Sequence, residues 1–171
     1  MPQHELDYAE RVSVARLHAL LELLPRTLDQ QMSEVGLTSF EYTVLEALRE
    51  AEGNRLRLSA LASRTNATLP RLSRVVTGLE KRGLVVRAAC TEDGRATNAV
   101  LTAPGDRVYE RARPVYEQMV RSLVLAGLDD ADVDELSRLT LAILTRLDPE
   151  RRMSITGEGD VECSADPTDR L

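Results

Sequence analysis

Three basic side chains recur at helical spacing near the middle of the chain. Arg71 and Arg74 are one helical turn apart, and Lys81 continues the same row. Basic groups on one face of a helix can donate hydrogen bonds to phosphate oxygens and to guanine edges in the major groove of duplex DNA. Such a row is also compatible with an ordinary solvated helix face. The charge distribution and the elements on either side favour contact with DNA.

A further basic side chain lies at the tip of a predicted β-hairpin. Two runs of β-prone residues, 84–90 and 96–101, are joined by five residues that contain the hairpin-forming pair Asp-Gly. Arg95 at this tip can reach the minor groove, whose negative potential attracts a guanidinium group. Asp93 is placed to hold that group by a charge-assisted hydrogen bond. The alternative is a tip that is charged only for solubility, and we favour the DNA contact.

The basic residues are concentrated in one segment of an acidic chain. The whole chain carries a formal charge of −6, yet residues 55–95 hold nine of the 22 lysines and arginines against three acidic residues. The remainder carries 13 basic and 25 acidic residues. This segregation predicts a basic face on an acidic frame. The aromatic content of 3% argues against a stacking platform for single-stranded nucleic acid.

Two short helices are predicted to lie just before the basic row. A capping box that opens at Thr38 begins a helix over 39–51. After a short strand over 56–58, Ser59 is the expected N-cap of a helix that ends at Arg64.

The next turn and helix carry the candidate DNA contacts. Residues 65–67 form the turn, and Asn66 tolerates the left-handed backbone that a tight turn requires. Thr68 is the expected N-cap of the helix, and Pro70 lies in its first turn, where proline costs little. The apolar stripe that faces the core consists of Leu72, Val75, Val76 and Leu79, and the opposite face displays Arg71, Ser73, Arg74, Thr77 and Lys81.

Long helices are predicted on both sides of this segment. The first covers 6–32, and Pro25 predicts a kink or a break near Leu24. Another begins at the N-cap Thr102 and is expected to bend at Pro114.

A last helix opens with the acidic run 129–135, because negative side chains are favourable at a helix N-terminus, and it ends at Pro149. The acids do not have the spacing of a calcium loop, so no metal site is predicted. The apolar rows of the three long helices form either an intramolecular core or a dimer seam. We favour the dimer, because helices separated by the whole central segment do not easily bury these rows alone. The polar residues 149–171 predict a disordered tail.

Taken in order, several segments resemble the MarR-type transcriptional regulators. They are Leu37–Leu45, Leu61–Ala62, Leu72–Arg87, Asp93–Arg95 and Leu101–Gly105. The resemblance implies a mainly α fold with a small β-wing, in which a winged helix-turn-helix lobe sits on a helical dimerisation frame. The implied divisions are a dimerisation helix (1–36), the DNA-binding lobe (37–103), C-terminal dimerisation helices (104–148) and the tail. Carried over by position, the residues that face the major groove are Pro70, Arg71, Ser73, Arg74 and Thr77. The wing tip is formed by Asp93 and Arg95. These residues, together with Thr68 and Lys81, are the candidate DNA contacts.

The sequence therefore predicts a homodimeric, sequence-specific regulator of transcription that binds an inverted-repeat operator in double-stranded DNA. The resemblance implies a repressor that is released by a small aromatic or phenolic effector. We expect no catalytic activity and no cofactor, because the sequence has no nucleophile elbow, phosphate-binding loop or metal-ligand cluster. The lack of a long apolar run and of a secretion signal predicts a cytoplasmic protein without a membrane partner.

Two other functions are compatible with the same residues. Oxidation of Cys90, near the wing, would make the chain a redox-responsive regulator, and a winged helix can also bind protein instead of DNA. Cys90 and Cys163 are too few for a disulfide framework. The candidates for lining an effector cavity are His18, Tyr42, Tyr109 and Tyr116, although half-buried packing is the commoner role of such side chains.

Overall fold

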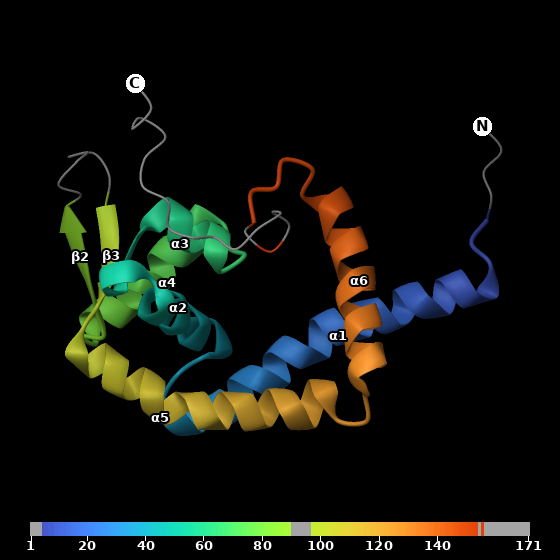
Figure 1. The fold of residues 1–171 in the computed structure, drawn as a ribbon, viewed down its shortest axis with the longest axis horizontal. Helices are drawn as coiled ribbons and strands as arrows, with labels where there is room; N and C mark the ends of the chain where they lie inside the picture. The colour runs from blue at the N-terminus through green and yellow to red at the C-terminus, as the bar shows by residue number, and fades with distance from the viewer. Residues whose placement is uncertain (1–4, 90–96, 154, 156–171) are drawn as a thin grey trace.

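The fold is mainly helical with one small antiparallel sheet, as the sequence predicts. The computed structural model describes residues 5–89, 97–153 and 155. The elements in chain order are α1 (Tyr8–Met32), η1 (Ser33–Val35), α2 (Ser39–Glu50), η2 (Glu52–Asn54), β1 (Arg55–Arg57), α3 (Leu58–Arg64), α4 (Leu69–Lys81), β2 (Val85–Ala89), β3 (Thr97–Leu101), α5 (Ala103–Val120), η3 (Arg121–Leu125) and α6 (Asp130–Leu147). Figure 1 shows a compact lobe of α2, α3, α4 and the strands at one end, with α1 and α6 projecting away from it.

Helix α1 is continuous from Tyr8 to Met32, with Pro25 inside it. Of the kink or break predicted near Leu24, the break is therefore wrong. A proline removes one backbone hydrogen bond, and that loss is local. The end of α1 is held independently, because Met32 is fully buried in the core.

The two short helices of the lobe form where the sequence predicts them, with one shifted boundary. Helix α2 begins with the capping box of Thr38 and Glu41. Strand β1 starts one residue earlier than expected and helix α3 two residues earlier, with Arg57 as its N-cap, so the assignment of Ser59 as the cap is wrong. The reason is the sheet: Leu56 must point inward opposite Ala99 of β3, which ends the extended segment at residue 57.

The sheet has the strand order β1-β3-β2, and all pairs are antiparallel. Strands β2 and β3 fall within the two β-prone runs of the sequence, with Arg87 opposite Ala99. The residues that join them, 90–96, lie outside the described part of the chain.

Helix α5 belongs to the core of the protomer. Thr102 caps it by accepting a hydrogen bond from the amide of Gly105. Ala112 and Met119 are buried, and Val108 and Val115 pack against the same core cluster. This row therefore packs within one protomer, where α5 contacts α2, and the dimerisation role expected for residues 104–148 stays a prediction. Pro114 lies inside the helix, and Figure 1 shows that α5 changes direction along its length.

Among the α-helices of the described residues, α6 differs from the others in having no buried residue. Its capping box of Asp129 and Asp132 opens the helix at the predicted acidic run. After the helix, the carbonyl oxygen of Arg152 accepts a hydrogen bond from Ser63 Oγ of α3. The remainder of the predicted tail, 156–171, is not described.

The described residues include neither a candidate membrane span nor a candidate metal site. None of their helices combines the length and the apolar character needed to cross a membrane. Nor do three or more of their His, Cys, Asp or Glu side chains come together in a group that could hold a metal ion.

Candidate nucleic-acid interface

The turn between α3 and α4 has the tight geometry that the sequence predicts. Asn66 has a φ of 52°, in the left-handed region. The amide of Ala67 donates to the carbonyl oxygen of Ala62 at 2.9 Å, which closes the end of α3. The turn therefore fixes the direction in which α4 leaves α3, and with it the face that α4 presents to solvent.

The residues at the N-terminus of α4 are exposed. Thr68 is the N-cap residue, as predicted, but its side chain makes no capping hydrogen bond within the described residues. Pro70 lies in the first turn. Both side chains are thus on the surface at the helix N-terminus, where the positive end of the helix dipole favours an anion.

The inner face of α4 anchors the helix in the core, and this leaves its basic residues outside. Leu72, Val76 and Leu79 are fully buried. Arg71, Arg74 and Lys81 are exposed. The separation of the two faces follows directly from the helical period of the apolar residues.

The two arginines of the outer face have different surroundings. The guanidinium carbon of Arg71 lies 4.3 Å from the centroid of the Phe40 ring, a cation–π contact that places this side chain against α2. The Nε of Arg74 lies 3.4 Å from the carbonyl oxygen of Pro70, so its side chain turns back along the outer face toward the helix N-terminus. Each guanidinium group is therefore held by a different kind of contact.

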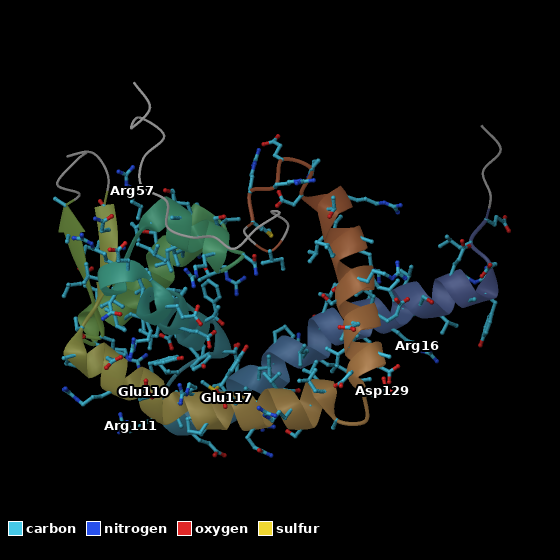
Figure 2. All side chains as sticks on the ribbon, in the orientation of Figure 1. Arg16, Arg57, Glu110, Arg111, Glu117 and Asp129 are labelled. Atoms are coloured by element: carbon cyan, nitrogen blue, oxygen red, sulfur yellow. The ribbon has the colours of Figure 1, made fainter. Side chains whose placement is uncertain are left out.

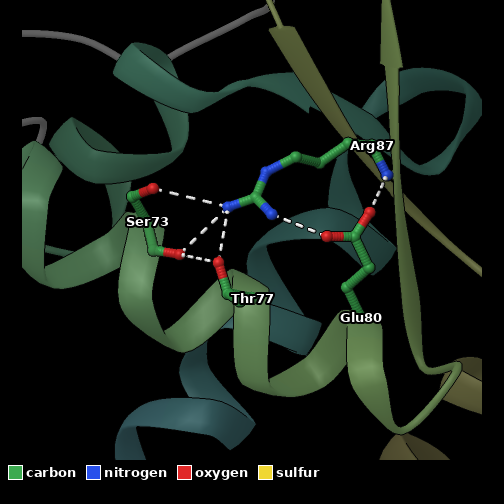
Figure 3. Close-up of polar contacts among 4 residues, drawn as sticks. All are labelled: Ser73, Thr77, Glu80 and Arg87. Atoms are coloured by element: carbon green, nitrogen blue, oxygen red, sulfur yellow. Dashed lines mark hydrogen bonds and ion pairs between the residues drawn. The ribbon is translucent and has the colours of Figure 1, made fainter.

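Ser73 and Thr77 are half-buried, and both contact an arginine of the wing strand (Figure 3). Arg87 Nη2 donates to the carbonyl oxygen of Ser73 at 3.0 Å and to Thr77 Oγ1 at 3.0 Å. Ser73 Oγ is a longer contact of the same nitrogen, at 3.4 Å. Arg87 Nη1 donates to the carboxylate of Glu80 at 2.6 Å, and the backbone amide of Arg87 donates to Glu80 Oε1 at 3.2 Å.

Neither Arg87 nor Glu80 is among the residues that the sequence singles out as functional. A signal exists: Glu80 is the one acidic residue between positions 55 and 91. Arg87 shares a strand face with the buried Val85 because alternate residues point the same way. A charged group on an inward face needs a partner, and Glu80 is the one acid of α4, the helix that packs against β2.

Part of the basic charge of the lobe is neutralised internally. Arg64 pairs with Glu50 at 2.6 Å, and Arg82 pairs with Glu41 at 3.1 Å. Figure 2 places Arg57 at the wing end of the lobe, on the opposite side from α5. The excess of basic residues in the sequence is therefore larger than the charge that the lobe offers to a polyanion.

Three predicted residues of the wing lie outside the described residues. These are Asp93 and Arg95, the predicted wing tip, and Cys90, the candidate redox group.

The predicted effector residues divide into a cluster and an isolated residue. Tyr42 of α2 stacks on Tyr109 and Tyr116 of α5, with ring centroids 5.5 and 4.1 Å apart. Burial raises the pKa of all three tyrosine hydroxyls. His18 is exposed on α1 and takes no part in this stack. The rings fill the junction between α2 and α5 by contact with one another.

A carboxylate lies at the edge of the stacked rings. Tyr42 donates its hydroxyl hydrogen to Glu46 Oε1 at 2.8 Å. Burial raises the pKa of Glu46, and the negative charges of Glu50 and Glu117 add to this, against the opposing hydrogen bond from Tyr42. The charge of ionised Glu46 therefore lowers the free energy of unfolding. This loss is absent at pH values below the pKa of Glu46 in the unfolded chain. It grows as the pH rises to the pKa of Glu46 in the folded protein and stays constant above that pH.

Replacing Glu46 by glutamine is expected to stabilise the protein at pH 7, because the amide keeps an acceptor for Tyr42 and removes the buried charge. A gain of about 2 °C in Tm is the expected size for this chain length. The gain should shrink toward zero as the pH is lowered to about 4.5, where the carboxyl of the unfolded chain becomes protonated. Thermal denaturation followed by circular dichroism at both pH values measures it, and a lower Tm of the variant at pH 7 contradicts the assignment.

Comparison with known proteins gives consistent matches. A sequence model of the MarR family matches residues 35–96. The transcriptional repressor YetL of Bacillus subtilis is 29% identical over 112 residues, which span 66% of this chain and 66% of YetL. AbsC, a MarR family transcriptional regulator from Streptomyces coelicolor, is 31% identical with a TM-score of 0.81, over 86% of this chain and 99% of AbsC. Sco3205, a MarR family regulator of the same organism solved in complex with DNA, is 31% identical with a TM-score of 0.82, over 85% of this chain and 92% of Sco3205.

Proposed function

Since this chain belongs to the MarR family of DNA-binding transcriptional regulators, which are not enzymes, we propose that it is a homodimeric repressor of transcription that binds an inverted-repeat operator. In this proposal α4 enters the major groove and the wing tip, with Asp93 and Arg95, reaches the adjacent minor groove. The proposed contacts on α4 are Thr68, Pro70, Arg71, Arg74 and Lys81. The protein acts in the cytoplasm, where such an operator lies.

The observation that carries the dimer is the apolar surface of α6. This helix of 18 residues has no buried side chain. Val133, Leu136, Leu139 and Ile143, which share one face by helical spacing, are between 37% and 46% exposed. A monomeric protein rarely leaves so continuous an apolar row in water.

Helix α1 contributes further exposed apolar groups. Its exposed apolar side chains include Val14, Leu20, Leu21 and Leu23. A second copy of the chain, related by a two-fold axis, covers matching rows on both partners at once. The same axis relates two copies of α4, so the proposed half-sites lie about 10 bp apart.

Binding to duplex DNA at several salt concentrations tests the proposal. The expected result is tight binding of an inverted repeat by a dimer, weaker binding of random duplex, and an affinity that falls steeply as salt is added. Light scattering of the free protein and fluorescence anisotropy of labelled duplex measure these quantities. An affinity independent of salt would instead favour a protein partner for the winged lobe.

The second part of the proposal is release by a small aromatic effector. Its support is the stack of Tyr42, Tyr109 and Tyr116, which joins α2 of the lobe to α5. An aromatic ligand that parts these rings changes how the lobe sits on α5, and it needs only to bind that conformer better than the DNA-binding one. Titration of the DNA complex with simple phenols should lower the anisotropy, and a complex unaffected by millimolar phenols contradicts this part alone.

A glycine on the outer side of α4 gives a separate prediction. Gly78 follows Arg74 by one turn, and a Cβ built on it would meet no atom within 4 Å. Glycine inside a helix costs about 1 kcal/mol relative to alanine, so the protein itself gains nothing from it. Gly78→Ala should therefore raise the Tm by roughly 2–4 °C. If the bare helix surface admits the DNA backbone, the same variant should bind operator several-fold more weakly.

Thermal denaturation and anisotropy on the same preparation measure these two opposite effects. A more stable variant with unchanged operator affinity would show that Gly78 does not approach the DNA.

A further inference from the structure

The hydrogen bonds of Thr77 determine what its hydroxyl can do. Thr77 Oγ1 donates its only hydrogen to the carbonyl oxygen of Ser73, at 2.8 Å. It also accepts a hydrogen bond from Arg87 Nη2 at 3.0 Å. A hydroxyl has one hydrogen, so none is left for an acceptor on a base or a phosphate. In this arrangement the Thr77 hydroxyl cannot donate a hydrogen bond to DNA.

The contacts of Arg87 extend along much of α4. Ser73, Thr77 and Glu80 are its partners on the helix. They span eight residues, or about 10 Å of helix axis. Figure 3 shows the guanidinium group reaching from the strand to the helix, with contacts at both of its terminal nitrogens. The planar fork of an arginine fixes both the distance and the rotation of a group that it binds in this way.

The position of Arg87 on its strand makes this contact relevant to DNA. Arg87 lies two residues before Ala89, the end of β2, from which the chain enters the wing. The side chain is half-buried, so its hydrogen bonds are shielded from competition with water. One side chain therefore ties the recognition helix to the strand that carries the wing.

We propose that Arg87 is a positioning residue for DNA recognition, which sets the spacing between α4 and the wing by holding Ser73, Thr77 and Glu80. Ser73 and Thr77 act through Arg87 and do not read bases. This inference rests on the proposed function, because it requires α4 to enter the major groove while the wing meets the minor groove. A duplex presents these two grooves at a fixed separation, so a helix and wing that move independently bind it less well.

A double-mutant cycle on Thr77 and Arg87 tests the proposal. Thr77→Val keeps the shape of the side chain and removes the hydroxyl, Thr77→Ser keeps the hydroxyl, and Arg87→Lys keeps the charge but loses the fork. Operator affinity is measured by anisotropy for each variant and for the pair, against the natural operator, against operators changed at each base pair in turn, and against random duplex. Thr145→Val is the matched control, because Thr145 makes the same hydroxyl-to-carbonyl bond, to Leu141 on α6.

If Arg87 positions the helix, Thr77→Val should weaken operator binding roughly five- to tenfold, while Thr77→Ser and Thr145→Val stay within about twofold. Thr77→Val should leave the base preference at every operator position unchanged and weaken binding of random duplex as well, because every duplex presents the two grooves at the same separation. The double variant should be no weaker than Arg87→Lys alone, because both changes break one contact. The measurements on Thr77→Ser and on the operators with changed base pairs test the inference even if the Arg87→Lys variant does not fold.

Two results would overturn the inference. One is a double variant whose loss of operator affinity equals the sum of the losses, in free energy, of the two single variants. The other is a Thr77→Val variant that no longer discriminates between bases at one operator position. Arg74→Ala in the same assay separates this from the proposed function. If Arg74→Ala weakens binding and the cycle is additive, only the role of Arg87 is wrong. If Arg74→Ala and every α4 variant bind normally, α4 is not in the interface and both proposals fail.

Discussion

Operator affinity is expected to fall by about 1–3 kcal/mol, or roughly five- to 150-fold, when Arg74 is replaced by alanine. Arg74 lies on the exposed face of α4, opposite the buried Leu72 and Val76. Its Nε lies near the carbonyl oxygen of Pro70, which keeps the guanidinium group close to the end of the helix that enters the groove first. Arg71→Ala should have an effect of similar size, because its stacking on Phe40 holds the group in place.

Salt titration distinguishes a base contact from a phosphate contact at these positions. Loss of a phosphate contact weakens binding to all sequences, and it lowers by about one the slope of the logarithm of the affinity against the logarithm of the salt concentration. Loss of a base contact instead relaxes the base preference at one operator position. Arg111→Ala is the control: Figure 2 shows Arg111 on α5, on the opposite side of the lobe from Arg57. Normal affinity of both the Arg71 and Arg74 variants would remove α4 as the recognition helix.

Charges placed on the apolar row of α6 are expected to separate the dimer and abolish tight operator binding. Leu136→Glu combined with Leu139→Glu puts two carboxylates into the proposed seam, where each meets its symmetry mate or apolar side chains. A single lobe engages one half-site without the gain from linked binding, so operator affinity should fall by about 100-fold or more. Light scattering gives the mass, and anisotropy gives the affinity.

Thr145→Glu provides the comparison for this variant. Helical spacing places Thr145 on the side of α6 away from Leu136 and Leu139, so one more negative charge there should leave the mass and the affinity unchanged. The melting curve of the charged variant should retain a cooperative transition, since α6 contributes no buried residue to the protomer. A wild-type chain that is monomeric in solution, or a charged variant that stays dimeric, would refute the seam.

Short-range chemistry explains why the sequence alone predicts the lobe closely. The capping box at Thr38, the left-handed Asn66 and the start of α4 at Thr68 depend on groups within a few residues of one another. The inner stripe of α4 depends only on the helical period. Ser59 fails as a cap because a distant strand, β3, decides where β1 must end.

What covers each surface is decided by tertiary structure. Periodicity marks an apolar row on α5 and on α6 in the same way, yet α5 packs into the core of the protomer while α6 is left exposed. The sequence likewise places Thr77 beside Arg74 on the helix. In the structure, however, the Thr77 hydroxyl accepts a hydrogen bond from the half-buried guanidinium group of Arg87, which lies ten residues further along the chain. The period of a helix determines which side a residue is on, whereas its partners depend on which other segments the chain brings against that side.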